Sequence, residues 1–351
     1  MPSIELVMIV RDEARCLARC LASAKPWVDG IVVVDTGSVD DTAAIARAHG
    51  ARVSHFEWIH DFAAARNAAL DASDADWRLV LDADEWIEGE GASLATLRSR
   101  HDPAIGQVRV VSRFDAAGGG EAPSWLPRLL PRGVRYEGRV HEQPTSTLPR
   151  FRLPLSVGHD GYLEAQRASK LGRNERLLAL ALEGSPGDAY LHYQMGKDLE
   201  LGGRFAEASA HYEQAFAGAD ARAGWRHDLV LRLLFTLKRL DRFDAAVPLA
   251  EAEMANWNDS PDFFFTLGDL LLGWAAHEPA RGPALLPMIE SSWLRALEIG
   301  ERPELQDTVR GRGSFLAAHN LAVLHQSLGD EAAAGRWRAQ ERSLREAGLP
   351  A

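Results

Sequence analysis

The sequence predicts two domains, an α/β domain with a mostly parallel sheet and an all-α domain built from helical repeats. Two observations support this division. Up to about residue 160, short runs rich in β-branched residues alternate with helical stretches, and after that point only helical patterns remain. With 351 residues, 46% of them apolar, the chain is long enough and apolar enough for both domains to bury a core.

The first half is expected to consist of βαβ units. In chain order the expected elements are a strand "IELVMIV", a helix over about 13–24, a strand "GIVVVD", a helix over about 40–49, a strand "RVSHF", a helix over about 61–71 and a strand "WRLVLD". Alternation at this spacing is typical of parallel strands joined by crossover helices. Alternating apolar residues in "QVRVVS" and "FRLPLSV" predict further edge or antiparallel strands.

The second half contains an internal repeat. In "HYQMGKDLELGGRFAEASAHYEQA", Gly196, Ala208, Tyr212 and Ala215 fall at the offsets of the small and aromatic positions of a tetratricopeptide repeat. Further units are read in "LFTLKRLDRFDAAVPLAEA", "FFFTLGDLLLGWAA" and "AHNLAVLHQSLGDEAAAGRW", with a stretch rich in Pro and Gly at 278–287 interrupting the third. The pattern predicts a short, degenerate solenoid whose concave face binds a partner.

Composition narrows the function classes. A net charge of −11 argues against binding nucleic acid through bulk electrostatics. No stretch has the roughly 18 to 20 uninterrupted apolar residues of a membrane span, and "MPSIELVMIV" lacks the basic segment of a signal peptide, so we expect a cytoplasmic location. Cys16 and Cys20, spaced i,i+4, are expected to be small buried side chains rather than a disulfide or a zinc site.

Three carboxylates lie where the strand "WRLVLD" ends. Because side chains alternate along a strand, Asp82 and Asp84 are expected to project the same way from its carboxyl end, the edge at which open α/β sheets bind ligands. Such a pair suits Mg²⁺ or Mn²⁺ bridging to substrate phosphates, and the metal would remove the repulsion between like charges. A second strand ends on Asp35, which either joins the same cleft or caps the following helix.

Four motifs occur in the order and spacing of a known family. "LVMIVRDEARCLARCLAS", "DTGSVDDTAAIARAHGA", "DFAAARNAAL" and "DWRLVLDADEW" resemble glycosyltransferase family two, the inverting nucleotide-sugar enzymes of the GT-A fold, over about residues 3–165. The chain is most similar to a bacterial subgroup with C-terminal tetratricopeptide repeats, which includes relatives of enzymes that glycosylate bacteriocin peptides and flagellin. That subgroup also carries an Arg-containing strand, a Gly-x-x-His-Glu stretch and a His-x-Gly-Tyr stretch. The corresponding segments of this chain are "PRLLPR", "GRVHEQ" and "GHDGY".

The resemblance implies three segments and a donor site. A GT-A domain is expected over 1–165, a connector helix over 166–188 and tetratricopeptide-like repeats over 189–351. The residues implied for the nucleotide sugar are Val10, Arg11, Asp12, Glu13, Asp35, Arg66, Asp82, Arg128 and Arg132. Among them Arg66 would balance the diphosphate charge, unless it lies on a solvated helix face, and Arg128 and Arg132 would bind the leaving diphosphate or an acidic acceptor.

The resemblance also implies a metal site. Asp84 would ligate Mn²⁺ or Mg²⁺ directly, Asp82 would contact the ribose or the metal, and His159 in "GHDGY" would be a further ligand. A structural role for His159 is the alternative. Glu85 receives no role beyond orienting its neighbours.

For the catalytic base, the first candidate is Glu142 in "RVHEQ" and the second is His141. The usual base motif of the family is an acidic pair, from which "HEQ" departs, and Asp115 is a further alternative. Asp115 begins "DAAGGGEAP", which is expected to be either a mobile loop over the donor or a plain surface loop. In the connector, Lys170, Arg173 and Asn174 match a feature of the subgroup.

The resemblance therefore implies a metal-dependent inverting glycosyltransferase that uses a nucleoside-diphosphate sugar. We expect a protein or peptide acceptor docked on the repeats. The alternatives are a lipopolysaccharide or other surface glycan as the acceptor, or an inactive interaction protein. A nucleotidyltransferase or a dehydrogenase is disfavoured, because "VRDEARC" follows the first strand where those classes carry a Gly-rich loop.

Overall fold

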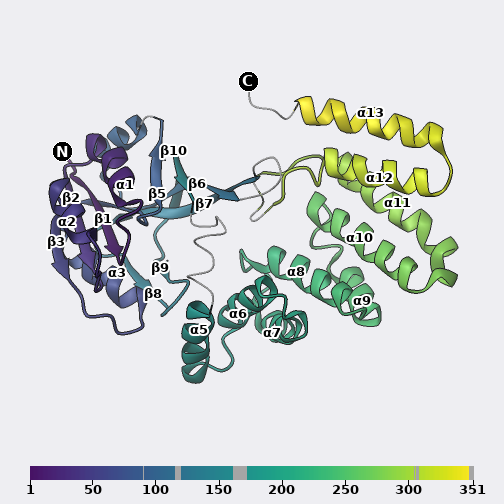
Figure 1. Ribbon diagram of the computed structural model, residues 1–351, viewed down its shortest axis with the longest axis horizontal. Coiled ribbons are helices and arrows are strands. Elements are labelled where there is room, and N and C mark those ends of the chain that lie inside the picture. The colour runs from purple at the N-terminus through teal and green to yellow at the C-terminus, as the bar shows by residue number, and fades with distance from the viewer. Residues whose placement is uncertain (90, 115–119, 161–171, 304, 306–307, 348–351) are drawn as a thin grey trace. The chain divides into compact units, whose positions relative to one another are not determined.

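The computed structural model describes residues 1–89, 91–114, 120–160, 172–303, 305 and 308–347 (Figure 1). It divides into two compact units, Met1–Gly184 and Ser185–Ala351. Two residues singled out in the sequence, Asp115 and Lys170, lie outside the described residues. Within the described part of the chain, no helix is both long and apolar enough to cross a membrane.

The first unit is built on a mixed sheet, in which eight strands are described in the order β3-β2-β1-β4-β7-β6-β10-β5. Its strands are β1 (Ile4–Val10), β2 (Gly30–Asp35), β3 (Arg52–His55), β4 (Trp77–Val80), β5 (Glu85–Glu88), β6 (Ile105–Phe114), β7 (Gly120–Pro131) and β10 (Arg150–His159). The first four strands are parallel to one another, as the βαβ pattern predicts. β7 is antiparallel to both β4 and β6, and β5 is antiparallel to β10.

Some strands differ from the sequence prediction. β6 and β10 were predicted as edge or antiparallel strands. Each has an antiparallel neighbour, β7 and β5 respectively, but the two also pair with each other in parallel, so neither is an edge strand. β5 takes the edge next to β10 instead. Of the stretch predicted as a Gly-rich loop, residues 115–119 lie outside the described residues, and residues 120–123 belong to β7. A separate two-stranded ribbon, β8 (Arg135–Glu137) and β9 (Gln143–Thr145), was also not predicted.

Helices cover both faces of the sheet. α1 (Leu17–Ala24) and α2 (Thr42–Ala48) pack on one face, against alternate side chains of β1 such as Leu6 and Met8, while α3 (Phe62–Asp71) packs on the other, against Val7. This burial on both faces explains why "IELVMIV" is apolar almost throughout. Short helices η1 (Lys25–Trp27) and η2 (Ala92–Ser99) and the longer α5 (Arg173–Gly184) complete the described elements of this unit.

The residues just before α1 and α3 determine where these two helices begin. α1 starts four residues later than predicted, because Asp12 has a left-handed backbone (φ 53°) and the chain turns before Leu17. α3 begins at Phe62, directly after Asp61, whose side chain accepts a hydrogen bond from the Ala64 amide at 2.9 Å. Such a cap satisfies an amide that has no partner within the helix.

The second unit consists of helix pairs, of which four are described (Figure 1). The pairs are α6 (Ala189–Leu201) with α7 (Phe205–Gly218), α8 (Arg226–Arg239) with α9 (Phe243–Glu253), α10 (Pro261–His277) with α11 (Gly282–Ile299), and α12 (Phe315–Ser327) with α13 (Glu331–Ala347). The repeat positions read from the sequence lie inside the pairs. Ala208, Tyr212 and Ala215 are fully buried, and a Cβ on Gly196 would overlap the Tyr212 ring.

The third pair corrects one prediction. The expected interruption over 278–287 amounts to a single short turn, η3 (Pro279–Arg281), after which α11 begins at Gly282. Pro283 lies in the first turn of α11, where a missing amide hydrogen costs nothing because it would have no acceptor within the helix. Pro283 therefore lies at the start of α11 and Pro287 lies inside the same helix, so neither proline interrupts the repeat.

Candidate active site

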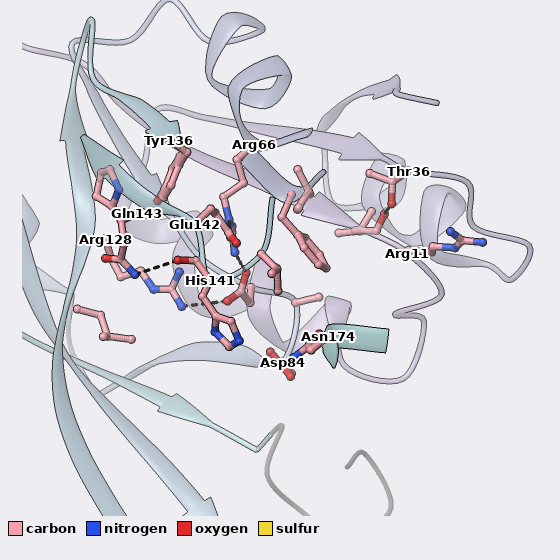
Figure 2. Close-up of a pocket in the computed structure, with 18 of the residues that line it drawn as sticks. Arg11, Thr36, Arg66, Asp84, Arg128, Tyr136, His141, Glu142, Gln143 and Asn174 are labelled. Atoms are coloured by element: carbon pink, nitrogen blue, oxygen red, sulfur yellow. Dashed lines mark hydrogen bonds and ion pairs between the residues drawn. The ribbon is translucent and has the colours of Figure 1, made fainter. Parts of the chain in front are cut away.

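A pocket of about 400 Å³ lies at the carboxyl edge of the parallel strands (Figure 2). β1 and β4 end there, which is where ligands of open α/β sheets bind. The residues predicted for the site that line it are Val10, Arg11, Glu13, Arg66, Asp82, Asp84, Arg128, His141, Glu142 and His159. Arg173 and Asn174 line it as well, and so do three residues that the sequence did not indicate, Thr36, Phe62 and Tyr136.

Asp12 and Asp35 do not line the pocket but hold the loops beside it. The Asp35 carboxylate accepts hydrogen bonds from the amides of Gly37 (3.0 Å) and Ser38 (2.8 Å), which closes the turn after β2. Asp12 ties the first loop to the second, because its carboxylate accepts from the Val39 amide at 2.8 Å and its own amide donates to the Ser38 hydroxyl at 3.0 Å. Both acids thus shape the loops that follow β1 and β2.

Arg132 lies outside the pocket, although Arg128 lines it. β7 runs antiparallel to β4, so Leu129 is paired with Leu79 while Pro131 is paired with Trp77, at the amino end of β4. Four residues of strand span about 13 Å. Arg132 is therefore carried towards the opposite edge of the sheet, where its exposed guanidinium donates to the carbonyl of Asp74.

The centre of the pocket wall is a chain of alternating charges. The two carboxylate oxygens of Asp82 accept hydrogen bonds from different arginines, from Arg66 at 2.7 Å and from Arg128 at 2.9 Å. Each arginine also binds a second carboxylate, since Arg66 donates to Glu142 and Arg128 donates to Glu85 (Figure 2 draws the wall of the pocket). The negative charges of Asp82 and Glu85, which follow β4, are thus compensated by guanidinium groups of the protein itself.

The electrostatics of this wall follow from burial and pairing. Burial alone would raise the pKa of Asp82, but the two arginines outweigh it and hold this pKa well below its usual range. Burial does raise the pKa of Glu85, with Arg128 offsetting part of the effect. Glu85 also accepts the Asp82 amide at 2.9 Å, so its carboxylate fixes both the backbone of the turn and the guanidinium of Arg128.

Asp82 and Asp84 both line the pocket, but they bind different partners. Strand pairing in β4 stops at Val80, and the chain turns at Ala83 and Asp84, so the alternation of a strand no longer applies to these two side chains. Asp84 pairs instead with His159, with 3.6 Å between the carboxylate and Nε2. Among the described residues, no group of three or more His, Cys, Asp or Glu side chains is arranged to hold a metal ion.

His159 is oriented by a second contact. Its Nδ1 lies 3.1 Å from the Ser112 hydroxyl on β6, so that Nε2 is the ring atom turned towards Asp84. Burial lowers the pKa of His159, but the hydrogen bond and the charge of Asp84 outweigh it, and the net pKa is raised. The pair combines one carboxylate with one imidazole, a donor set that suits a divalent cation such as Mn²⁺.

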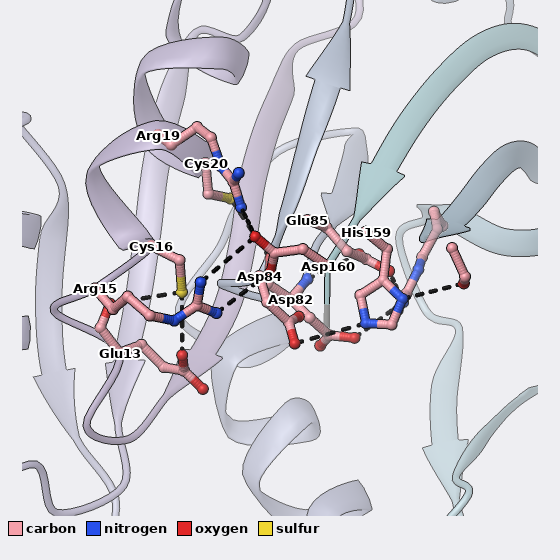
Figure 3. Close-up of polar contacts among 12 residues, drawn as sticks. Glu13, Arg15, Cys16, Arg19, Cys20, Asp82, Asp84, Glu85, His159 and Asp160 are labelled. Carbon is pink, nitrogen blue, oxygen red and sulfur yellow. Dashed lines mark hydrogen bonds and ion pairs between the residues drawn. The ribbon is translucent and has the colours of Figure 1, made fainter. Parts of the chain in front are cut away.

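A second cluster, which the sequence did not indicate, fixes the end of β10 (Figure 3). Asp160 is buried and accepts hydrogen bonds from Arg19 on α1 at 2.6 Å and from Arg15, just before α1, at 3.3 Å. The Asp160 amide donates to the Asp84 carbonyl at 3.3 Å. One residue therefore ties α1, the turn after β4 and the strand of His159 together.

Cys16 and Cys20 lie next to this cluster, and both are free and buried, as expected. Burial and the hydrogen bond to Glu13 raise the pKa of Cys16 to about 12, and burial raises that of Cys20 further above its usual value. Neither thiol ionises near neutral pH, so neither is a reactive nucleophile.

The loop between β8 and β9 carries the candidate base. His141 has a left-handed backbone (φ 53°), a conformation that costs energy for a residue with a side chain and often occurs at functional sites. Glu142 follows it, with 11% of its side chain exposed at the pocket wall. Phe62 holds this loop on α3, because its amide donates to the Arg139 carbonyl at 2.8 Å.

Comparison with known proteins finds similar sequences and folds. The family model described as Glycosyl transferase family 2 matches residues 5–136. A TPR repeat-containing protein of Synechococcus elongatus is 35% identical over 270 residues, which cover 72% of this chain and 66% of that protein. The SPbeta prophage-derived glycosyltransferase SunS of Bacillus subtilis is 28% identical over 247 residues, which cover 67% of this chain and 58% of that protein.

The chain thus spans less than two thirds of the length of these two curated relatives. Among solved structures, MamA 41-end from Desulfovibrio magneticus RS-1 is 17% identical, with a TM-score of 0.40, and the match covers 53% of this chain and 93% of that one.

Proposed function

We propose that this chain, whose N-terminal unit contains a glycosyltransferase family 2 domain, is an inverting, metal-dependent glycosyltransferase with a protein or peptide acceptor. The observation that carries the proposal is the pocket at the carboxyl edge of β1 and β4, which brings Asp84, His159 and Glu142 to one cavity of about 400 Å³. A cavity of this size is within the range of small-ligand and cofactor sites.

The nucleoside of the donor would bind beside the loop after β1. Val10, Arg11 and Thr36 line the pocket there, and Figure 2 shows Arg11 and Thr36 together at one end. The Thr36 hydroxyl is fixed by donation to the Val10 carbonyl at 3.1 Å. Asp12 and Asp35 would contribute indirectly, by holding the loops that carry these residues.

Asp84 and His159 would hold the divalent cation. Their carboxylate and imidazole fit Mn²⁺ or Mg²⁺, and the bound cation would stabilise the negative charge that develops on the departing nucleoside diphosphate. Such a charge is needed, because Arg66 and Arg128 already neutralise carboxylates of the protein. Ser112 would keep Nε2 of His159 directed to the cation by binding the other ring nitrogen.

Glu142 would be the general base. Inversion requires a group that removes the proton of the acceptor while the acceptor attacks the anomeric carbon, and a carboxylate in the pocket wall meets this need. His141 is the alternative base, since it lines the same pocket. Asp84 pairs with His159, and both carboxylate oxygens of Asp82 bind arginines, whereas the described contacts of Glu142 engage one oxygen, Oε1, so Glu142 is the better candidate.

The acceptor would bind to the helical unit. The first helix of each described pair carries one large apolar side chain that is exposed to solvent: Leu201 on α6, Phe235 on α8, Leu272 on α10 and Val323 on α12. Exposed apolar side chains that recur once per repeat suit an extended peptide, which presents side chains at regular intervals. This favours a peptide or protein acceptor over a surface glycan.

A ligand screen tests the proposed activity. We expect Mn²⁺ together with one member of a panel of nucleoside diphosphates and their sugars to raise the melting temperature, because a ligand of the native state stabilises it. The same sugar nucleotide should be hydrolysed slowly in the presence of Mn²⁺ and not in its absence. A panel of UDP, GDP, dTDP and CMP compounds that gives neither a shift nor hydrolysis would contradict the proposal.

A further inference from the structure

We propose that Arg66 is a positioning residue for Glu142 and does not bind the donor diphosphate. This inference rests on the proposed function, since it concerns the candidate base. It differs from what the resemblance implies for Arg66, and it follows from four observations on the buried side chains around the guanidinium.

The first observation is that the guanidinium of Arg66 binds two carboxylates of the protein. Its Nε donates to Oε1 of Glu142, and its Nη2 donates to Oδ1 of Asp82 at 2.7 Å. Only 9% of the Arg66 side chain is exposed. Charge-assisted hydrogen bonds of this kind are among the stronger polar contacts in proteins. Two of the three nitrogens are thus committed to the protein.

The third nitrogen is not available to a ligand either. Nη1 of Arg66 has essentially no accessible surface, and it has no hydrogen-bond partner among the described residues. A phosphate group in the pocket would have to displace the protein around Nη1 to reach it. Arg66 therefore lines the pocket while Nε and Nη2 bind carboxylates of the protein and Nη1 is covered.

The second observation is that α3 and the base loop are fixed to each other. Asn67 makes two hydrogen bonds of 2.9 Å with the backbone of Tyr136 on β8, one as donor and one as acceptor. The Arg66 guanidinium lies 5.5 Å from the centre of the Tyr136 ring. α3 thus presents Arg66 at a set place beside Glu142, as Figure 2 shows.

The third observation is the balance of charge. Arg66 lies between two carboxylates that are mostly withdrawn from water, Glu142 and Asp82, with 11% and 35% of their side chains exposed. Removal of the cation would leave both acids without this counterion, which is costly for buried charges. Glu142 would then turn towards water or another cation and lose its orientation.

The fourth observation concerns the free oxygen of the base. Arg66 engages Oε1 of Glu142, and no described hydrogen bond or ion pair engages Oε2. Oε2 is therefore the atom that would take the proton of the acceptor. The contact with Oε1 sets the direction of Oε2. Arg66 would therefore affect the reaction by orienting Glu142.

The decisive experiment separates turnover from donor binding. Arg66→Gln and Arg66→Lys are compared with the wild-type chain in the Mn²⁺-dependent hydrolysis of the sugar nucleotide that gives the largest shift in the thermal screen. We expect kcat to fall by about tenfold or more in Arg66→Gln, with KM and the dissociation constant of the sugar nucleotide changed less than about twofold. Arg66→Lys, which keeps a cation, should recover part of the lost kcat.

Arg98→Gln is the matched control, because Arg98 makes a paired salt bridge with Asp29 on the surface of the same unit, away from the pocket. It should change neither kcat nor KM. A loss of donor affinity in Arg66→Gln as large as the loss of kcat/KM would overturn the inference and restore Arg66 as a diphosphate ligand.

A second measurement needs no activity. In thermal unfolding, the melting temperature of the double variant Arg66→Gln, Glu142→Gln should fall by less than the sum of the two single changes, because the first substitution has already removed the contact. Additive changes would overturn the inference. If no sugar nucleotide binds the wild-type chain, the proposed function fails, and this coupling alone decides whether Arg66 holds Glu142.

Discussion

At the scale of single residues, the pocket separates two kinds of carboxylate. Asp82 and Glu85 are bound by arginines and serve the architecture of the wall. Asp84 pairs with the imidazole of His159, and Glu142 has one oxygen that no described contact uses. We therefore propose cation binding for Asp84 and proton transfer for Glu142, although all four residues are acidic.

Glu142→Gln tests the assigned base. The amide keeps the shape of the side chain but cannot accept the proton, so we expect turnover to fall by roughly 10² to 10⁴, the range that general-base catalysis supplies. Donor binding, measured as the thermal shift with Mn²⁺ and the sugar nucleotide, should be retained. Glu137→Gln is the control, since Glu137 is an exposed acid on the neighbouring strand β8. Unchanged turnover would move the base to His141.

Asp84→Ala tests the cation site. Removal of one of two protein ligands should abolish the additional thermal shift that Mn²⁺ produces with a nucleoside diphosphate, because the cation would keep only His159. The control is Asp74→Ala, which removes a fully exposed carboxylate from the same unit. Mn²⁺-dependent stabilisation that persists in Asp84→Ala would show that the cation binds elsewhere.

The residue scale also shows what a sequence can and cannot indicate. The carboxylates after β4, Arg66 and Glu142 were found because each lies in a short motif. The pairing of Arg66 with Glu142 was not predicted, because the two residues are 76 positions apart in the sequence. Nothing in the local sequence indicates which carboxylate a buried guanidinium binds. The same holds for Asp160, whose arginine partners lie 141 and 145 positions away.

At the scale of elements, local patterns predicted the parallel strands and the helix pairs well. The four parallel strands β1 to β4 are runs of four to seven residues between helical stretches, and the repeats place small residues where helices cross. β5, β8 and β9 escaped prediction because three or four residues between turns are too short to show a period. β5 matters most, since it occupies the edge next to the strand that carries His159.

The helix crossings of the second unit lead to a prediction on stability. Gly196→Ala should destabilise this unit by about 1–3 kcal/mol, because the added Cβ would overlap the Tyr212 ring between α6 and α7. Gly335→Ala is the matched substitution in α13, where the Cβ meets no atom within 4 Å, and it should stabilise by up to about 1 kcal/mol. Equal effects in chemical denaturation would contradict the close packing of α6 on α7.

At the scale of the whole molecule, the chain combines a unit that the Glycosyl transferase family 2 model matches with a unit built from helical repeats. The change in periodicity near residue 160 indicated this combination, and the structure gives compact units of Met1–Gly184 and Ser185–Ala351. The acceptor could not be read from the sequence, because the residues exposed on a repeat are those that the repeat pattern leaves free to vary.

The exposed apolar side chains of the first helices provide the test of acceptor binding. Simultaneous replacement of Phe235, Leu272 and Val323 by Ser should weaken binding of an acceptor peptide tenfold or more, because each buried apolar side chain contributes about 1.5–3 kcal/mol. Donor binding should not change, since these residues lie outside the pocket. The measurement is peptide affinity by fluorescence anisotropy, with a peptide selected from a random library on the wild-type chain.

The matched control replaces three equally exposed apolar residues that do not lie on the first helices, Met254, Met288 and Leu294. Both triple variants remove a similar apolar area, so a general effect on solubility or stability would affect them alike. If peptides bind through the first helices, only the Phe235, Leu272 and Val323 variant loses affinity. Equal loss in the two variants would exclude these helices as the acceptor surface and would favour an acceptor bound by the first unit alone.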